Sequence, residues 1–345
     1  MFFYGEKSHT VVEKLLQKLS EYLYDDYFRS LFFSRLRVGI QIAVYKKQLD
    51  QQQILPSQTK RGDTIFMLLD QFMNGINMGA VYALVGLGFA LVYSVLGLIN
   101  FAHGEVCMIG AFLAFSAMTW MGLGFYPALF LSIILTGVLG ILIDRIGFRP
   151  IQKAPHIAQL ISTLALSIIL RNLAMLIWGS RTFPFPNELG ENLRIVIPVL
   201  LLILVVMLHL GITRTKMGMA VRAISMNPEM ASAMGVNSNR IVTGVVAVGS
   251  ALGGLAGILI AMYYAAVTFD MGYTLALKAF VASIIGGLGS IYGTILGGLI
   301  LGLSEGLVQA YISTSYTDVF AFTVFILVLL FRPAGLWGKS VEKGG

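Results

Sequence analysis

A polar loop between two long apolar segments holds the residues whose types and order point to a specific interaction (214–240, RTKMGMAVRAISMNPEMASAMGVNSNR). Asn227 precedes Pro228 as an N-cap precedes the first residue of a helix, and Glu229 follows where a carboxylate suits the positive end of the helix dipole. Gly235 stands where a helix commonly ends. The loop therefore predicts a short surface helix at roughly 228–234, which can dock onto a partner.

Polar side chains inside the apolar segments form a second set of candidates. An ionisable group in a membrane span is costly unless it pairs or faces water, so it is first treated as functional. These candidates for a translocation path are Asn74, Asn100, His103, Glu105, Glu305 and Gln309. Asn100, His103 and Glu105 fit equally well as helix caps at the membrane interface, and both interpretations stay open. One histidine and one carboxylate make a poor metal set, so no metal site is predicted.

The composition of the chain sets its class. Of its 345 residues, 57% are hydrophobic and only 12% are charged, and the mean hydropathy is +0.81. In a soluble domain roughly a quarter of all residues are charged, so these values indicate a membrane protein. The net charge of +7 comes from basic residues at the ends of apolar segments, which indicates topology signals and not nucleic-acid binding. The single cysteine, Cys107, excludes a disulfide framework within the chain.

The hydropathy pattern predicts the helices that position these residues. The apolar segments are 66–96, 100–119, 126–143, 157–178, 195–213, 239–266, 276–289, 291–312 and 317–332. They predict an all-α polytopic membrane protein with about eight transmembrane helices, eight or nine in all. Short or glycine-interrupted segments such as 276–289 predict broken or re-entrant helices, which are tolerated where they pack inside protein or line a polar cavity.

Glycines at four-residue spacing predict how these helices pack. Small residues let two backbones approach closely in lipid, where hydrophobicity gives helices no preference for one another. Two consecutive rows predict close packing, and they consist of Gly289, Gly293 and Gly297, then Gly298, Gly302 and Gly306.

The distribution of basic residues predicts the orientation of the chain. Arg145, Arg149 and Lys153 follow one apolar segment, and further basic residues flank the loop 214–240, so both loops are predicted to be cytoplasmic. The link 179–194, whose acidic and basic residues balance, then lies outside the cell.

The chain divides into three parts. Residues 1–63 are rich in charge and contain no apolar run near the ~20 residues of a span. They are a cytoplasmic or interfacial extension, a disordered tail, or translated upstream sequence before a true start at Met67, where the membrane pattern begins. The transmembrane domain is predicted at 64–338 and a cytoplasmic tail at 339–345.

No phosphate-binding loop of the form G-x-x-x-x-G-K-[ST] occurs in the sequence. The nearest match ends in Gly-Lys-Ser at 338–340, but Pro333 stands where the first glycine is required. The chain is therefore not expected to hydrolyse nucleotide itself.

Several motifs in a fixed order carry a family resemblance. Glu229, Ala231 and Gly235 reproduce the spacing of the EAA-type loop of bacterial ABC importer permeases, with Met230 in place of the first alanine. The other motifs are INFAHGE (99–105), GSRTFPFP (179–186), MGMAVRA (217–223), MGVNSNRI (234–241), KAFVASIIGGLGSIYGTILGGLILGLSEGL (278–307) and RPAGLWG (332–338). Together they closely resemble the shorter of the two permease subunits of branched-chain amino acid ABC importers.

The resemblance implies a transport subunit in a bacterial inner or plasma membrane, with 64–338 as the permease domain. Its implied partners are a second, similar permease, two cytoplasmic ATPases that use the ATP, and an extracytoplasmic binding protein that delivers leucine, isoleucine or valine. No cofactor bound by this chain is implied. The residues implied in coupling to an ATPase are Arg222, Pro228, Glu229, Ala231 and Gly235.

Two alternatives to this function remain open. Permeases of the same superfamily import urea or other amino acids, so the substrate is one open point. The other alternative is an ion-coupled secondary transporter that uses His103, Glu105 and Glu305 as its ion path.

Overall fold

The computed structural model describes residues 61–152, 154–332 and 335–336. The predicted N-terminal extension, apart from residues 61–63, and the tail at 339–345 lie outside the described residues. The structure divides at Ile65, and the described residues from Phe66 onward form one compact unit.

Nine apolar helices form the described bundle, and each overlaps one of the predicted apolar segments. Six are long and apolar enough to cross a membrane: α3 (Arg61–Leu96), α5 (Phe125–Ile143), α6 (His156–Trp178), α7 (Leu193–Arg214), α10 (Ser238–Tyr263) and α12 (Ile291–Tyr311). Three apolar helices are shorter: α4 (His103–Thr119), α11 (Met271–Gly286) and α13 (Thr317–Phe331). The all-α polytopic class predicted from hydropathy is therefore confirmed.

The helices divide into an inner and an outer group. In their most apolar windows, α3 and α10 have 83% of their residues buried, whereas α7 has 11%. Helices α4 and α11 also lie inside, because α4 packs on α10, α5 and α11. The outer faces of α5, α6 and α7 expose large apolar side chains, as expected where lipid or another membrane subunit covers a helix.

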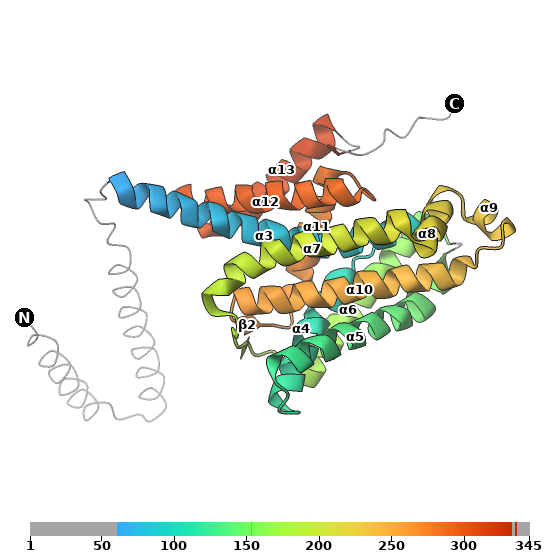
Figure 1. Cartoon of the computed structure of the whole chain (residues 1–345), viewed down its shortest axis with the longest axis horizontal. Helices are drawn as coiled ribbons and strands as arrows, with labels where there is room; N and C mark the ends of the chain where they lie inside the picture. The colour runs from blue at the N-terminus through green and yellow to red at the C-terminus, as the bar shows by residue number, and fades with distance from the viewer. Residues whose placement is uncertain (1–60, 153, 333–334, 337–345) are drawn as a thin grey trace, which may run out of the picture. The chain divides into compact units, whose positions relative to one another are not determined.

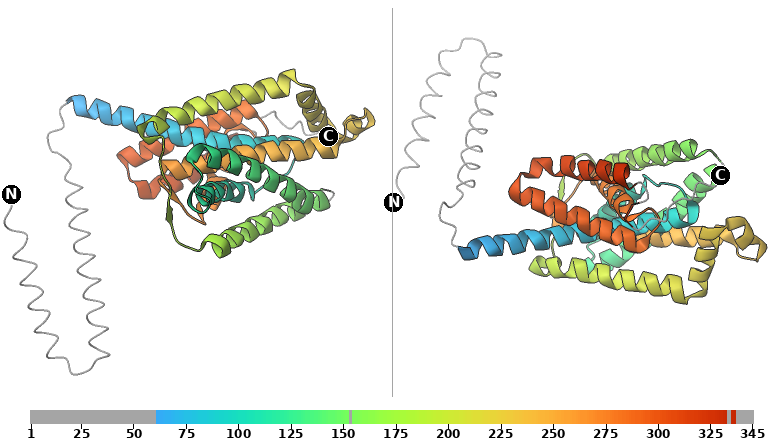
Figure 2. Two further views of the ribbon diagram at one scale, coloured as in Figure 1. Left: turned by 60° about the horizontal axis from the view of Figure 1, so that its bottom comes forward. Right: turned by 90° about the horizontal axis from the view of Figure 1, so that it is seen from above.

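The second glycine row of the sequence lies at the contact between α12 and α3 (Figures 1 and 2). A Cβ atom at Gly302 would lie 2.1 Å from the backbone nitrogen of Gly79, and one at Gly298 would lie 2.7 Å from that of Ala83. Gly306 faces the backbone of Gly75 in the same way. Side chains at these positions would force the two helices apart.

The first glycine row was predicted correctly only in part. Gly293 and Gly297 face α11, where a Cβ atom would lie 2.2 Å from the carbonyl oxygen of Gly286 and 2.0 Å from that of Ala282 respectively. Gly289 belongs to neither helix, because it lies in the turn between α11 and α12 with a φ of +80°. Its placement in a helix-packing row was wrong, and a backbone turn that favours glycine explains this residue instead.

Two structures mark opposite ends of the bundle. The polar helices α8 (Lys216–Met226) and α9 (Pro228–Ala233) lie at one end, beyond α7 and before α10 (Figure 1). At the other end β1 (Phe183–Pro184) pairs antiparallel with β2 (Ala266–Val267). The link predicted outside the cell therefore meets the loop after α10, away from the polar helices. The described chain also contains one short π-helix, η1 (Asp144–Phe148), and three short 3₁₀ helices, η2 (Arg149–Ile151), η3 (Gly190–Asn192) and η4 (Thr314–Tyr316).

Candidate functional site

Helix α9 is closed at both ends by the residues that predicted it. The Asn227 side-chain oxygen accepts hydrogen bonds from the backbone N–H groups of Glu229 and Met230, each at 3.0 Å. At its other end the Val236 N–H donates to the Ala231 carbonyl at 3.1 Å, in a Schellman arrangement. The chain turns at Gly235, whose φ of +84° suits glycine. These bonds hold a very short helix in one shape.

One side of α9 packs on the protein and the rest is free. Ala231 is buried in the same apolar cluster as Ile224 of α8. Arg222, Pro228, Glu229 and Gly235 are all exposed. The residues implied in coupling therefore comprise one anchor and four groups that a partner can reach.

Helix α8 was not predicted from the sequence. Thr215 caps it by accepting a hydrogen bond from the Gly218 N–H at 3.0 Å, and this threonine before a run of helix-forming residues was the available signal. Helices α8 and α9 and the residue after α9 carry exposed methionines, whose flexible and polarisable side chains are common at binding surfaces. These are Met217, Met219, Met226, Met230 and Met234.

A buried carboxylate joins the end of α5 to the beginning of α10, directly after α9. Asp144 is fully buried and accepts from Thr243 Oγ1 at 2.6 Å and from Arg149 Nε at 3.2 Å. A second guanidinium nitrogen of Arg149 donates to Thr243 Oγ1 at 2.5 Å and to the Asn239 carbonyl at 3.3 Å. Because these residues span two helices, a displacement of the α10 terminus is passed to α5.

Thr243→Val is expected to loosen this junction. Valine keeps the shape but removes the hydroxyl, so Asp144 stays buried with Arg149 as its one remaining donor among those seen here. We expect the free energy of unfolding to fall by about 1–3 kcal/mol, seen as a lower melting temperature in detergent. Thr243→Ser keeps the hydroxyl and should melt like the wild type. Equal melting of the valine and serine variants would contradict the role of the hydroxyl.

The first buried polar cluster lies at the beginning of α4. Asn100 caps the turn before the helix, because its side-chain oxygen accepts from the Ala102 N–H at 3.1 Å. His103 is buried against Gly88 of α3 and Gly253 of α10. The Glu105 carboxylate accepts from Ser167 of α6 at 3.2 Å, and its other oxygen is buried without a hydrogen-bond partner among the described residues. The capping interpretation thus fits Asn100, whereas His103 and Glu105 lie inside the bundle.

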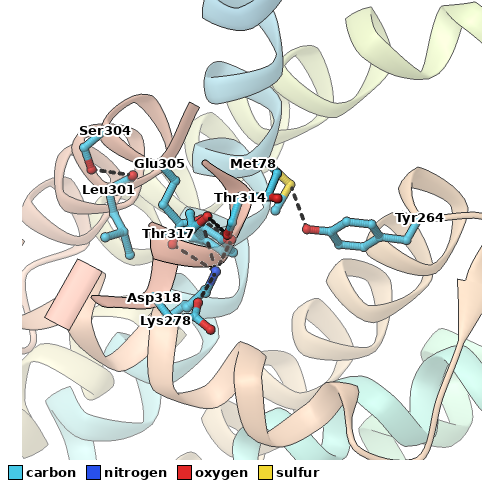
Figure 3. Close-up of polar contacts among 10 residues, drawn as sticks. Met78, Tyr264, Lys278, Leu301, Ser304, Glu305, Thr314, Thr317 and Asp318 are labelled. Carbon is cyan, nitrogen blue, oxygen red and sulfur yellow. Dashed lines mark hydrogen bonds and ion pairs between the residues drawn. The ribbon is translucent and has the colours of Figure 1, made fainter. Parts of the chain in front are cut away.

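The second cluster surrounds a lysine that the sequence analysis did not single out (Figure 3). Lys278 Nζ of α11 lies 3.0 Å from Glu305 Oε1 of α12 and 3.1 Å from Asp318 Oδ1 of α13. The Tyr82 hydroxyl of α3 donates to Glu305 Oε2 at 2.7 Å, and Lys278 Nζ lies 3.2 Å from that hydroxyl. Four helices therefore meet at one ammonium group. The signal available in the sequence was a single lysine inside an apolar segment.

The remaining predicted path residues lie outside these clusters. Asn74 is half-buried on α3, where its side-chain oxygen accepts from the Tyr263 hydroxyl at 3.4 Å. Gln309 is exposed near the end of α12, so the structure does not bring it to Glu305. Among the described residues, no group of three or more histidine, cysteine, aspartate or glutamate side chains is arranged to hold a metal ion.

Comparison with known proteins identifies the family. The family model described as "Branched-chain amino acid transport system / permease component" matches residues 71–329. The chain is 38% identical over 303 residues to the high-affinity branched-chain amino acid transport system permease protein BraD of Pseudomonas aeruginosa, covering 81% of this chain and 99% of BraD.

Two further relatives show the range of the similarity. The chain is 36% identical to the high-affinity branched-chain amino acid transport system permease protein LivH of Escherichia coli K12, covering 80% of this chain and 97% of LivH. It is 24% identical to the ribose import permease protein RbsC of Haemophilus influenzae, covering 80% and 88% respectively. Since the family model spans most of the sequence and two relatives exceed 30% identity, this multi-pass membrane protein belongs to the family of branched-chain amino acid transport system permease components.

Proposed function

We propose that the chain is a permease subunit of an ABC importer that carries leucine, isoleucine and valine across a bacterial inner or plasma membrane. The family and the names of BraD and LivH support the transport role and the substrate class. The observation that carries the proposal is helix α9, which is capped at both ends, anchored by Ala231 and otherwise exposed. An ATPase needs such a rigid projection if it is to move the bundle.

The proposed partners are a second homologous permease, two cytoplasmic ABC ATPases and an extracytoplasmic binding protein. The basic residues around α8 and α9 support a cytoplasmic position for this end of the bundle. The exposed methionines of α8 and α9 support a docking surface there. The sequence lacks a phosphate-binding loop, so the ATP is used by the partners and no cofactor is assigned to this chain.

The mechanism follows from the contacts of α9. The Ser232 hydroxyl lies 2.8 Å from the Ser238 hydroxyl at the first residue of α10. A push on α9 is passed to α10, and the bonds of Asp144 carry it on to α5. ATP-driven closure of the ATPases would in this way shift the bundle between inward-open and outward-open states.

The translocation path is proposed to follow the inner helices α3, α4, α10 and α11 and the buried face of α12. His103, Glu105 and Glu305 support it, because each is at most 1% exposed on one of these helices. Charged groups buried at membrane depth are costly, so they are retained where a polar substrate must pass.

One observation favours an ion-coupled secondary transporter as the second candidate. Glu105 has a buried carboxylate oxygen without a hydrogen-bond partner in the described structure, close to Gly272 of α11. Such a group is suited to receiving a proton or another cation. If the chain is an importer, its alternative cargo is urea, another amino acid or a sugar. A sugar is included because the relative RbsC is named a ribose import permease protein.

Co-expression with the neighbouring genes tests the proposal. The tagged chain is purified in detergent, its partners are identified, and uptake of labelled leucine by the cells is challenged with unlabelled isoleucine, valine, urea or ribose. We expect an ATPase and a second permease to co-purify, and isoleucine and valine alone to compete. A chain that purifies alone and takes up leucine on an ion gradient would contradict the importer. Competition by urea or ribose would contradict the substrate class.

A further inference from the structure

The cluster around Lys278 is unevenly exposed. The Glu305 side chain is 1% exposed and that of Lys278 14%, whereas the Asp318 side chain is 62% exposed. Lys278 therefore holds one carboxylate fixed inside the bundle and another at its surface (Figure 3). The surface carboxylate gains little from the pair, because exposed ion pairs contribute weakly. Asp318 is thus the partner that another anion can replace.

The charges of the cluster do not cancel. One ammonium faces two carboxylates, so the cluster carries one excess negative charge. The Tyr82 hydroxyl donates to Glu305 and adds no charge. A free amino acid at the cluster would bring one ammonium and one carboxylate, which match the groups present. Its carboxylate suits Lys278, and its ammonium suits the exposed Asp318.

The cluster lies toward the end of the bundle opposite α9. Lys278 is two turns into α11, whose first residue follows β2 by a short loop, and Asp318 is the second residue of α13. Glu305 is in the last two turns of α12, which ends just before α13 begins. With α9 on the cytoplasmic side, this is the end at which a binding protein would release its cargo.

The Tyr82 ring closes the inner side of the cluster. Its centroid lies 5.4 Å from Lys278 Nζ, and the side chain is only 1% exposed. A ligand therefore reaches the ammonium from the side of Asp318, the exposed member of the cluster.

We propose that Lys278, Glu305 and Asp318 form a recognition site for the zwitterionic backbone of an amino acid entering the permease. The substrate carboxylate takes the place of Asp318 on Lys278, the released Asp318 holds the substrate ammonium, and the buried Glu305 keeps Lys278 in position. This site rests on the proposed function as an amino acid importer. The permease then binds the part that all free amino acids share, and the binding protein selects the side chain.

A purely structural role makes a different prediction. A buried ion pair that only fastens α11 to α12 can be replaced by apolar side chains of similar volume without loss, whereas removal of one partner leaves an unpaired charge. Lys278→Met together with Glu305→Met would then assemble and transport normally. If the cluster is instead a recognition site, the double variant has lost charges that bind the substrate, and it cannot transport.

The experiment uses the complete importer in proteoliposomes, with binding protein saturated with leucine. Maximal leucine uptake and ATPase activity are measured for the wild type, Lys278→Met, Glu305→Gln and the double variant Lys278→Met/Glu305→Met. The control is Ser304→Ala, because the Ser304 hydroxyl bonds only the Leu301 carbonyl of its own helix among the contacts described. We expect the double variant to assemble and keep its ATPase activity within about twofold, while uptake falls about tenfold or more.

The outcomes separate the possibilities. If the double variant transports like the wild type, the cluster is a packing contact and the recognition site is overturned. If a single variant fails to assemble, the double variant still decides. If the wild-type complex itself takes up no leucine, the proposed function fails before the site is tested.

Discussion

Replacing Gly235 by valine is expected to abolish ATP-driven uptake while the chain still inserts into the membrane. Gly235 turns the chain after α9 with a φ of +84°, which a β-branched residue adopts at a cost of about 1–3 kcal/mol. Apart from Gly235 and its two chain neighbours, no atom of the described residues lies within 4 Å of the position a Cβ would take, so the cost is in the backbone and not in packing. The turn is therefore expected to open, and α9 to lose the shape in which it docks. Uptake per unit of inserted protein measures the effect.

Gly122→Val is the matched control for this variant. Gly122 also has a positive φ, +65°, and open space around it among the described residues. However, it lies between α4 and α5, far along the chain from the loop 214–240 that holds α9. The Gly122→Val variant carries the same backbone cost, but we expect it to keep most of the transport activity. Glu229→Arg should act like Gly235→Val, because it reverses the charge at the exposed beginning of α9. If Gly235→Val or Glu229→Arg shows normal uptake with normal ATPase binding, that result would contradict the assignment of α9 as the helix that docks onto an ATPase.

Replacing Gly302 by valine is expected to be the most damaging change in the membrane domain. The added Cβ would lie 2.1 Å from the backbone nitrogen and 2.3 Å from the Cα of Gly79, and neither atom can rotate away. Helices α12 and α3 must separate, which costs about 3 kcal/mol or more. We expect a much lower yield of folded protein and a lower melting temperature in detergent.

Gly211→Val provides the comparison for Gly302. Gly211 lies inside α7, and a Cβ there would meet no atom within 4 Å. The two variants share the same change in helix propensity, so their difference isolates the helix contact. Equal melting temperatures would show that α3 and α12 do not depend on close approach at this glycine.

The positions of the helices could be predicted because lipid imposes a simple rule. A backbone in the membrane must form its hydrogen bonds within its own segment, so long apolar runs become helices. Helix α9 was equally predictable, since Asn227, Pro228 and Gly235 are local signals for the ends of a helix. The spacing of Gly298, Gly302 and Gly306 likewise indicated a packing face without naming its partner.

The clusters could not be predicted, because their members are far apart in the sequence. Lys278 meets Glu305 27 residues later and Tyr82 196 residues earlier, and no periodicity links such positions. The one-turn spacing of Glu305 and Gln309 suggested a shared face, but Gln309 lies near the helix end and is exposed. Gly289 fitted a four-residue row only by spacing, since such a count does not reveal where a helix stops.

The most direct test of an ATP-driven permease is uptake of labelled leucine by the reconstituted complex. Proteoliposomes contain this chain, the second permease and the ATPases, with loaded binding protein on the outer face and ATP inside. We predict uptake that requires ATP and is lost when the ATPases carry a substitution that blocks hydrolysis. Uptake that persists with the inactive ATPases and follows an imposed proton or sodium gradient would contradict the importer, and would make Glu105, His103 and Glu305 the groups to study next.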